Sequence, residues 1–353
     1  MAAEKSLREH GLRIGALDTG PAASIADVAG VRVGHVTVVR DEPDPPGGRG
    51  VARSGVTAVA PPEPDGIYGE PLPAGVAVLN GAGELTGALQ LAEWGELHTP
   101  VYLTATMSVG RVLDGAVTAA LAADARVGVD DVVIPVVGEC DDSWLNDARA
   151  VQVEPDDAGR ALADAAAAET VAEGAVGAGT GMVCFDWKGG IGSSSRVTGA
   201  GHTVGVLVLA NFGVRDELRV DGVPVGKLLD VPGEGGPPKP AGSCIAVVAT
   251  DAPLGTHELT RIATRAGLGL ARTGSSAHHG SGEIFLAFST NRAGHGGADL
   301  DTLFRATVEA TEEAVINAMW SAETTTGRDG RVVERLPHEP VLELLERHGR
   351  LGG

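Results

Sequence analysis

The sequence predicts a fold built from closely packed layers of β-sheet and helix. Apolar runs rich in Val and Ile alternate along the chain with Ala-rich stretches, which is the pattern of sheets covered by helices. Hydrophobic residues make up 43% of the chain, but aromatic residues only 3%, and there are 52 glycines. Small side chains must therefore fill most of the core, and this favours layers that approach one another closely.

Seven segments have the composition of strands, because they are rich in Val and Ile and are bounded by Gly, Pro or Asp. Many are continuously apolar, so we expect sheets with helices on at least one face. The predicted strands are residues 31–39, 75–79, 101–104, 132–137, 203–210, 244–250 and 284–289.

Five further segments have helical composition or spacing. In the last of them, apolar residues recur at roughly helical intervals. The predicted helices are residues 84–94, 110–123, 156–173, 256–271 and 298–322. The tail after residue 327 is charged, and we expect it to be peripheral.

Charge and cysteine content exclude several functions. The formal net charge is −20, which argues against binding to nucleic acid or to an anionic membrane surface. Three cysteines form no disulfide framework, and the N-terminus lacks the apolar stretch of a secretory signal. No apolar run is long enough to span a bilayer. We therefore expect a cytoplasmic protein.

We also expect no metal and no cofactor, because the histidines lack ligand spacing and no nucleotide-binding motif is complete.

One loop breaks the regular alternation of strands and helices. Residues 231–242 are rich in Pro and Gly, and Gly242 and Ser243 directly precede the predicted strand 244–250. A flexible loop thus leads to a hydroxyl at the start of a rigid strand. On composition alone, an ordinary connector and a capping serine are the more common explanations of this pattern.

The same junction suits an intramolecular N-to-O acyl shift. In that reaction the Ser243 hydroxyl attacks the carbonyl of Gly242, where a glycine tolerates an unusual backbone angle. Water then hydrolyses the ester and leaves Ser243 with a free α-amine. The reference pKa of an α-amine is about 7.7–8.0, so it can act as the base for the hydroxyl of its own residue.

Two other groups could complete such a site. Ser281 and Glu283 precede the predicted strand 284–289, and the two-residue period of a strand places both on one face. Their carboxylate and hydroxyl could orient a neighbouring amine or hydroxyl. Asn211 follows the predicted strand 203–210, and its amide could donate to a developing oxyanion. A solvated turn is the alternative for the first pair, and a simple turn residue is the alternative for Asn211.

Several long motifs, in fixed order, resemble the DmpA family of self-processing aminopeptidases, which includes the β-peptidyl aminopeptidases. The resemblance covers roughly residues 24–323 and includes the junction. The motifs are residues 27–35, 80–87, 108–110, 179–182, 187–196 and 242–254.

This resemblance implies a single α+β domain over residues 1–353, with a four-layer αββα sandwich like that of N-terminal-nucleophile hydrolases. It implies cleavage between Gly242 and Ser243, giving an α chain of residues 1–242 and a β chain of residues 243–353. It also implies a homo-oligomer of such αβ heterodimers, commonly four. Ser243 would be the nucleophile and Asn211 an oxyanion donor. Ser281 and Glu283 would position and polarise the amine and hydroxyl of Ser243.

The chain departs from the family at one position. Where we expect a tyrosine that shapes the active site, the aligned residue is Trp144, which can donate through its indole N–H but cannot titrate. In the same region Glu139 is a candidate for binding the free amino group of a substrate, with a solvated acidic loop as the alternative.

The function predicted from these residues is an aminopeptidase or amidase that acts on short peptides, amides or esters through an acyl-enzyme. Three alternatives remain: an endo-acting amidase of linear amide oligomers, an acyltransferase of the ornithine-acetyltransferase type, and an uncleaved, non-catalytic homologue. The preference for α-, β- or D-amino acids does not follow from the sequence.

Overall fold

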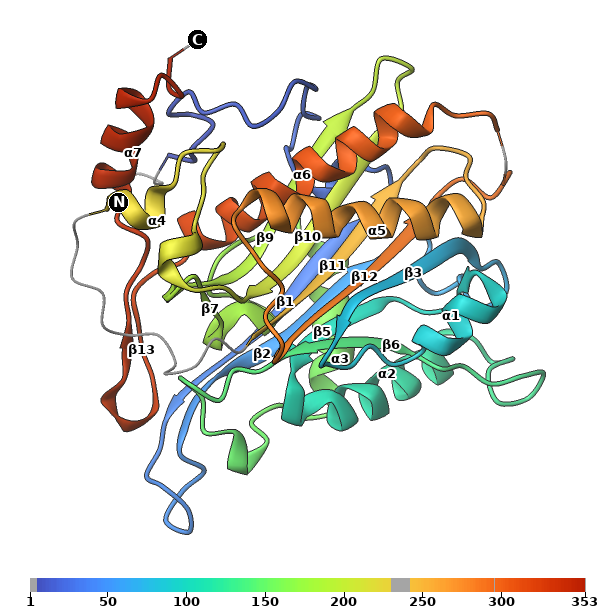
Figure 1. Ribbon diagram of the computed structural model, residues 1–353. Helices are drawn as coiled ribbons and strands as arrows, with labels where there is room; N and C mark the ends of the chain where they lie inside the picture. The colour runs from blue at the N-terminus through green and yellow to red at the C-terminus, as the bar shows by residue number, and fades with distance from the viewer. Residues whose placement is uncertain (1–4, 230–241, 295, 353) are drawn as a thin grey trace.

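The structure is a computed structural model that describes residues 5–229, 242–294 and 296–352. Two sheets lie face to face between two pairs of helices (Figure 1). The first sheet has four strands in the order β1-β2-β5-β6. These strands are Arg32–Asp41, Val51–Ala60, Val101–Ala105 and Val136–Cys140.

The second sheet has six strands in the order β4-β3-β12-β11-β10-β9. In that order they are Glu96–Leu97, Leu72–Gly81, Ser281–Ser289, Gly242–Thr250, Thr203–Asn211 and Gly190–Val197. Strands β11 and β12 are parallel, and β11 is antiparallel to β10 on its other side. Two short ribbons complete the strands: β7 (Val183–Cys184) with β8 (Trp187–Lys188), and β13 (Thr325–Thr326) with β14 (Val332–Val333).

Helices α5 and α6 cover the six-stranded sheet, and α2 and α3 cover the four-stranded sheet (Figure 1). The helices are α1 (Ala88–Trp94), α2 (Val109–Ala123), α3 (Asp156–Ala167), α4 (Val225–Leu228), α5 (Thr256–Arg272), α6 (Leu300–Trp320) and α7 (His338–Arg347). The layer order is therefore helix, sheet, sheet, helix, which is the four-layer α+β sandwich that the resemblance implied. No helix among the described residues is long and apolar enough to cross a membrane.

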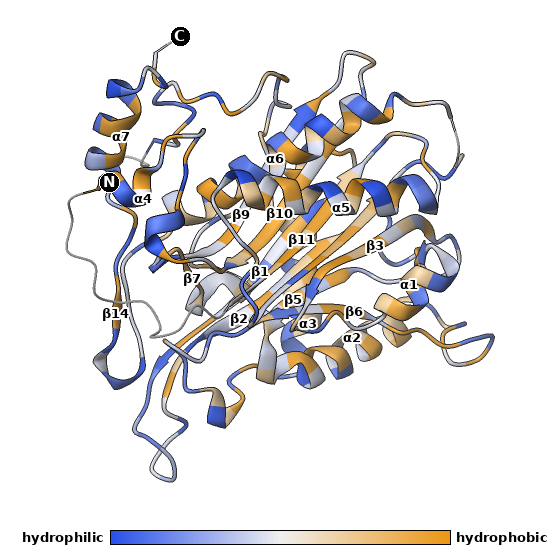
Figure 2. Cartoon of the chain, viewed as in Figure 1, coloured by the Kyte–Doolittle hydropathy of each residue, from blue (hydrophilic) through white to orange (hydrophobic). Residues whose placement is uncertain are grey.

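Three layers of buried side chains hold this sandwich together. One lies between the six-stranded sheet and α5 and α6, one between the two sheets, and one between the four-stranded sheet and α2 and α3. Strands β10 and β11 of the six-stranded sheet are hydrophobic along most of their length, whereas the covering helices alternate between hydrophobic and hydrophilic residues (Figure 2). This distribution is the one expected of strands buried on both faces.

Glycines bring the helices close to the sheets. A methyl group on Gly192 of β9 would lie 1.9 Å from the carbonyl oxygen of Ala314 in α6, and one on Gly34 of β1 would lie 2.1 Å from the backbone nitrogen of Ala165 in α3. No side chain fits at either position. The expectation of closely apposed layers, drawn from the glycine content, is met at these two contacts.

Four expected elements need correction. The strand expected at residues 132–137 is β6, Val136–Cys140, which starts later because Val132 and Ile134 are exposed. The helix expected at 84–94 begins only at Ala88, and the one expected to reach residue 173 ends at Ala167. The tail is not peripheral as expected, because its apolar residues enter the core beside the six-stranded sheet. Those residues are Leu336, Val341, Leu344 and Leu345.

Candidate active site

Ser243 lies at the start of β11, between β10 and β12. Strand β10 ends, and strand β12 begins, beside Ser243. Ser243 is paired with Asn211 of β10 on one side and with Gly282 of β12 on the other, and it is 5% exposed. Ile245, two residues along, lies in the core between the sheets. Because side chains alternate along a strand, the Ser243 side chain faces the same inter-sheet side.

Cys244 lies on the opposite face, in the core beneath α5 and α6. Burial raises the pKa of its thiol well above the ordinary value. Cys244 is therefore a packed core thiol.

Gly242 allows β11 to approach β10 closely. A methyl group on Gly242 would lie 2.0 Å from the carbonyl oxygen of Asn211 and 2.8 Å from the Cα atom of Phe212. This contact requires a glycine, because any side chain here would displace the residue before the nucleophile.

Ser243 lines a cavity of about 670 Å³. A second cavity of about 260 Å³ is lined by Asn211 and Trp144. Both cavities share four lining residues, so they form adjoining parts of one cleft. The shared residues are Asp141, Ser143, Gly242 and Arg328. The remainder of the loop predicted before Gly242 lies outside the described residues.

Glu139 of β6 lines the same cavity as Ser243 and is only 3% exposed. Its Oε1 atom accepts a hydrogen bond from the backbone N–H of Glu84 at 2.9 Å, and its Oε2 atom accepts one from the hydroxyl of Thr106. Burial raises the pKa of the Glu139 carboxyl, and these two hydrogen bonds oppose that effect. A methyl group on Gly83 would lie 3.0 Å from Glu139 Oε1 and 3.9 Å from Ser243 Oγ. The bare backbone of Gly83 therefore lies between carboxylate and hydroxyl.

The carboxamide of Asn211 is fixed at both ends. Its Oδ1 atom accepts a hydrogen bond from the backbone N–H of Val183 at 2.8 Å, and its Nδ2 atom donates to the carbonyl oxygen of Asp141 at 3.0 Å. Asn211 lies directly opposite Ser243 in the antiparallel pair, so both side chains lie on the same face of the sheet. The second N–H of Nδ2 is the group available to a bound molecule.

Ser281 and Glu283 share a face of β12, as expected, and the Ser281 hydroxyl donates to Glu283 Oε1. The strand alternation places this face with Phe285, in the core beneath α5 and α6, whereas the next residue, Ile284, lies between the sheets. The pair is therefore on the other side of the sheet from the Ser243 side chain. Burial raises the pKa of the Glu283 carboxyl.

Trp144 forms one wall of the second cavity, next to Asn211. The guanidinium group of Arg331 stacks over the Trp144 ring, with its Cζ atom 4.1 Å from the ring centroid. The same group donates a hydrogen bond to the carbonyl oxygen of Trp144. This cation–π contact fixes the ring against the C-terminal segment.

The sequence reasoning missed several residues of the cleft. Gly83 lies inside the motif of residues 80–87 and Thr106 lies just before that of residues 108–110, but neither carries a catalytic signature. Arg328 belongs to the tail that we expected to be peripheral, and only the tertiary fold brings it to both cavities. Among the described residues, no cluster of His, Cys, Asp and Glu could hold a metal ion.

Comparisons with known proteins agree on one family. The model of Peptidase family S58 matches residues 23–333. A β-peptidyl aminopeptidase, BapA, from Sphingosinicella microcystinivorans is 42% identical, over 93% of this chain and 89% of that protein.

Two solved structures extend the similarity to nearly the whole chain. The PH0078 protein from Pyrococcus horikoshii OT3 has a TM-score of 0.90 and 43% identity, covering 98% of this chain and 100% of its own. The L-aminopeptidase D-Ala-esterase/amidase from Ochrobactrum anthropi has a TM-score of 0.86 and 38% identity, covering 98% and 99%. That enzyme is described as a prototype of the serine aminopeptidases and a variant of the N-terminal-nucleophile hydrolase fold. The chain studied here therefore belongs to peptidase family S58.

Proposed function

We propose that this chain is an N-terminal-serine aminopeptidase that creates its own nucleophile by cleaving the bond between Gly242 and Ser243. One observation carries the proposal: the Ser243 side chain lines a cleft of about 670 Å³ together with Gly242 and the buried carboxylate of Glu139. A hydroxyl at the start of a buried strand that lines a cleft, next to the peptide bond it would attack, supports this reaction.

The first reaction is self-cleavage. The Ser243 Oγ atom attacks the carbonyl carbon of Gly242, and the peptide C–N bond breaks as an ester bond forms. The proton lost by the hydroxyl is transferred to the departing nitrogen, which becomes the free α-amine of Ser243. Water then hydrolyses the ester, regenerating the hydroxyl and leaving a carboxylate on Gly242.

The second reaction is substrate turnover. The α-amine of Ser243 removes the proton of its own hydroxyl, which attacks the scissile carbonyl of the substrate. The free N–H of Asn211 Nδ2 stabilises the oxyanion that develops. The α-ammonium then protonates the leaving amine, and water hydrolyses the acyl-enzyme.

The Ser281–Glu283 pair has a role that follows from its side of the sheet. Because it faces away from the Ser243 hydroxyl, we assign it to the α-amine that self-cleavage creates. A carboxylate near an ammonium favours the protonated form, so the pair would hold the amine in place and adjust its pKa.

Glu139 is the group that suits the amino group of the substrate. Its carboxylate is buried in the nucleophile's cavity, and a positively charged amine would supply the counter-charge that burial makes favourable. Trp144, on the wall of the adjoining cavity, would limit the size of the substrate group bound there. Short peptides, amides and esters that carry a free amine are the substrates of this proposal, and β-peptides are among those to test, given the name of the relative.

We also propose a cytoplasmic homo-oligomer of αβ heterodimers, with four as the expected number. Large apolar side chains on β3 and α1 are more than half exposed, which supports association through that surface. These residues are Val78, Leu79, Leu89 and Trp94.

Mass spectrometry of the purified protein tests the proposal. The mature enzyme should consist of two pieces, residues 1–242 and 243–353, and Ser243→Ala should yield one uncut, inactive chain. Ser289→Ala is the matched control, because this serine is also buried, at the far end of β12. It should be cut and active. Cleavage of the Ser243→Ala variant at residue 242, or full activity of an uncut chain, would refute the proposal.

Product analysis separates the alternatives. An aminopeptidase releases single N-terminal residues from peptide amides, an endo-acting amidase shortens linear amide oligomers internally, and an acyltransferase moves the acyl group to an added amine instead of to water.

A further inference from the structure

Lys188 of β8 is a buried cation that the proposed mechanism does not use. Its side chain is 0% exposed, and its Nζ atom donates three hydrogen bonds to carbonyl oxygens. These bonds go to Met182 at 2.7 Å, Gly189 at 2.9 Å and Gly179 at 3.1 Å. All three N–H groups of the ammonium are thereby used.

One of these carbonyl groups connects Lys188 to the candidate active site. The oxygen of Met182 and the nitrogen of Val183 belong to the same peptide unit. That nitrogen donates to Asn211 Oδ1 at 2.8 Å, and Asn211 Nδ2 points to the carbonyl oxygen of Asp141. An N–H donor can pair only with the oxygen of a carboxamide, so the Met182–Val183 peptide and the Asp141 carbonyl together set which way the amide of Asn211 is turned.

A hydrogen bond to the oxygen of a peptide polarises its N–H. When the donor is a cation in a low-dielectric interior, this effect is larger than with a neutral donor. The Met182 oxygen also accepts the backbone N–H of Gly189 at 3.0 Å. Lys188 is the charged donor of the two, so it helps to fix the orientation of the Met182–Val183 peptide and strengthens the hydrogen bond that this peptide makes to Asn211.

We propose that Lys188 is a positioning residue, which acts through the Met182–Val183 peptide to keep the carboxamide of Asn211 turned with its N–H group toward the cleft. This inference rests on the proposed role of Asn211 as an oxyanion donor. Lys188 itself touches neither the substrate nor Ser243.

Burying the ammonium group of Lys188 costs desolvation free energy, which a side chain that only fills space would not incur. Burial lowers the pKa of its ammonium to about 7, while the neighbouring Asp142 acts in the opposite direction. Asp142 is itself 1% exposed, and burial raises the pKa of its carboxyl to about 7. An apolar side chain would avoid these desolvation penalties, whereas only a donor can hold the Met182 carbonyl.

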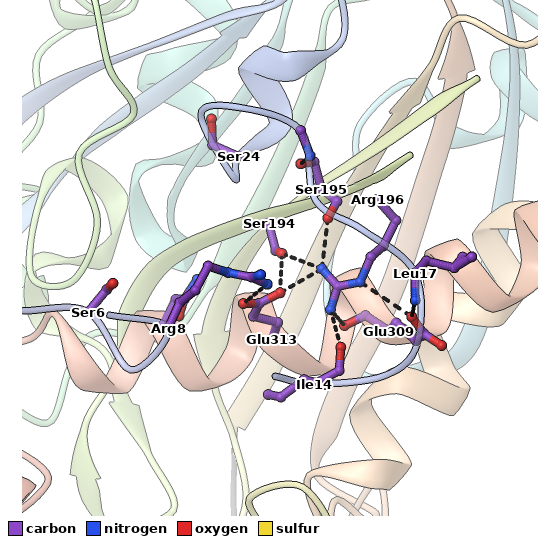
Figure 3. Close-up of polar contacts among 12 residues, drawn as sticks. Ser6, Arg8, Ile14, Leu17, Ser24, Ser194, Ser195, Arg196, Glu309 and Glu313 are labelled. Atoms are coloured by element: carbon purple, nitrogen blue, oxygen red, sulfur yellow. Dashed lines mark hydrogen bonds and ion pairs between the residues drawn. The ribbon is translucent and has the colours of Figure 1, made fainter. Parts of the chain in front are cut away.

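A second buried cation provides a control. Arg196 of β9 is also 0% exposed, and it pairs with Glu313 at 2.6 Å and with Glu309 at 3.4 Å (Figure 3). It also donates to the carbonyl oxygen of Ile14 at 2.7 Å, which anchors the N-terminal segment. Arg196 pairs with Val204, at the far end of β10 from Asn211. It therefore stabilises the fold without a connection to the amide of Asn211.

The test is a double-mutant cycle on the mature enzyme. Lys188→Met is measured alone and combined with Asn211→Ala, and kcat is expressed per mature Ser243 N-terminus counted by mass spectrometry. Asn211→Ala should lower kcat by about 100-fold, as expected for loss of an oxyanion donor. Lys188→Met should lower kcat by about 10-fold with little change in KM, but by less than about 2-fold when Asn211 is already replaced. Arg196→Lys should change kcat by the same factor in both backgrounds.

The outcomes are distinct. An equal loss of kcat from Lys188→Met in both backgrounds, or no loss at all, overturns the role of Lys188. If Asn211→Ala leaves kcat unchanged, the oxyanion role of Asn211 is wrong, which is a failure of the proposed function. Should Lys188→Met not fold, Lys188→Gln, whose amide keeps two donors, replaces it. The same background dependence, with a smaller loss, is then expected.

Discussion

In the proposed mechanism, the two buried carboxylates near Ser243 would bind different amines. Glu139 lies on the inter-sheet side, in the cavity that Ser243 lines, whereas Glu283 lies on the other side of the six-stranded sheet with Ser281. Burial raises the pKa of both carboxyl groups, and a bound ammonium would favour the ionised form of each. In that mechanism the sheet would separate the amine of the substrate from the amine of the nucleophile.

The pH dependence of activity should reveal Glu139. Its pKa is raised above the ordinary value of 4.5, and it binds a substrate amine only when ionised, so binding should weaken as the pH falls through this raised pKa. We expect kcat/KM for a peptide amide with a free amine to show this acidic decline. A matched ester without an amine should lack it, although both should decline when the α-amine of Ser243 is protonated.

Replacing the carboxylate provides the control for that measurement. Glu139→Gln should remove the difference between the two pH profiles, because the amide does not titrate. An acidic decline that is equal for both substrates, or one that differs between them even in Glu139→Gln, would contradict the assignment.

Only part of the candidate active site could be predicted from individual residues of the sequence. Period-two alternation was sufficient to place Ser281 beside Glu283, because both lie on one strand. It could not show on which side of the sheet they lie relative to the Ser243 side chain. That depends on the register in which β12 pairs with β11, and no local signal encodes it. The role of Lys188 was invisible for a similar reason, since its partners are backbone carbonyl groups.

At the level of elements, continuously apolar runs were recognised more readily than polar strands. Strand β9 was recognised only as part of a motif, because its centre reads Ser193-Ser194-Ser195. These serines are buried but hydrogen-bonded, with Ser193 donating to the carbonyl of Val206 and Ser194 to Glu313. A polar sequence can thus form a buried strand when a partner lies beside each hydroxyl, and those partners are distant in sequence.

The packing of α2 against α3 predicts opposite effects for two glycine substitutions. A methyl group on Gly159 of α3 has nothing within 4 Å, whereas one on Gly115 of α2 would lie 1.9 Å from the carbonyl oxygen of Pro155. Gly159→Ala should therefore stabilise the protein by about 0.5–1 kcal/mol through helix propensity. Gly115→Ala should destabilise it by about 1–3 kcal/mol, since the helices must move apart.

Urea unfolding of the two variants, each in the uncut Ser243→Ala chain, would measure these changes on a single polypeptide. The Ser243→Ala chain without a glycine substitution is the reference. A loss of stability in Gly159→Ala, or none in Gly115→Ala, would show that the spacing of α2 and α3 is not as described.

For the whole molecule, the order of strands determines what self-cleavage can do. Residues 243–353 supply β12 and all of β11 except Gly242, and these lie in the middle of the six-stranded sheet. On either side are β3 and β10, which belong to residues 1–242. The core is also shared between the two pieces. Helices α5 and α6 belong to residues 243–353, and they cover strands of both pieces. Breaking one peptide bond at the edge of β11 removes none of these contacts.

The two pieces should therefore remain one particle after cleavage. Separating them would unpair β10 from β11 and β12 from β3 and would expose the core beneath α5 and α6, which is equivalent to unfolding the sheet. On size-exclusion chromatography without denaturant, we expect both pieces to elute together and at the volume of the uncut Ser243→Ala chain, even after extensive dilution. A denaturing gel of the same fraction should show them apart. Elution of residues 1–242 separately from residues 243–353 under native conditions would contradict the interleaved sheet, because each piece would then have to be stable without strands that the other supplies.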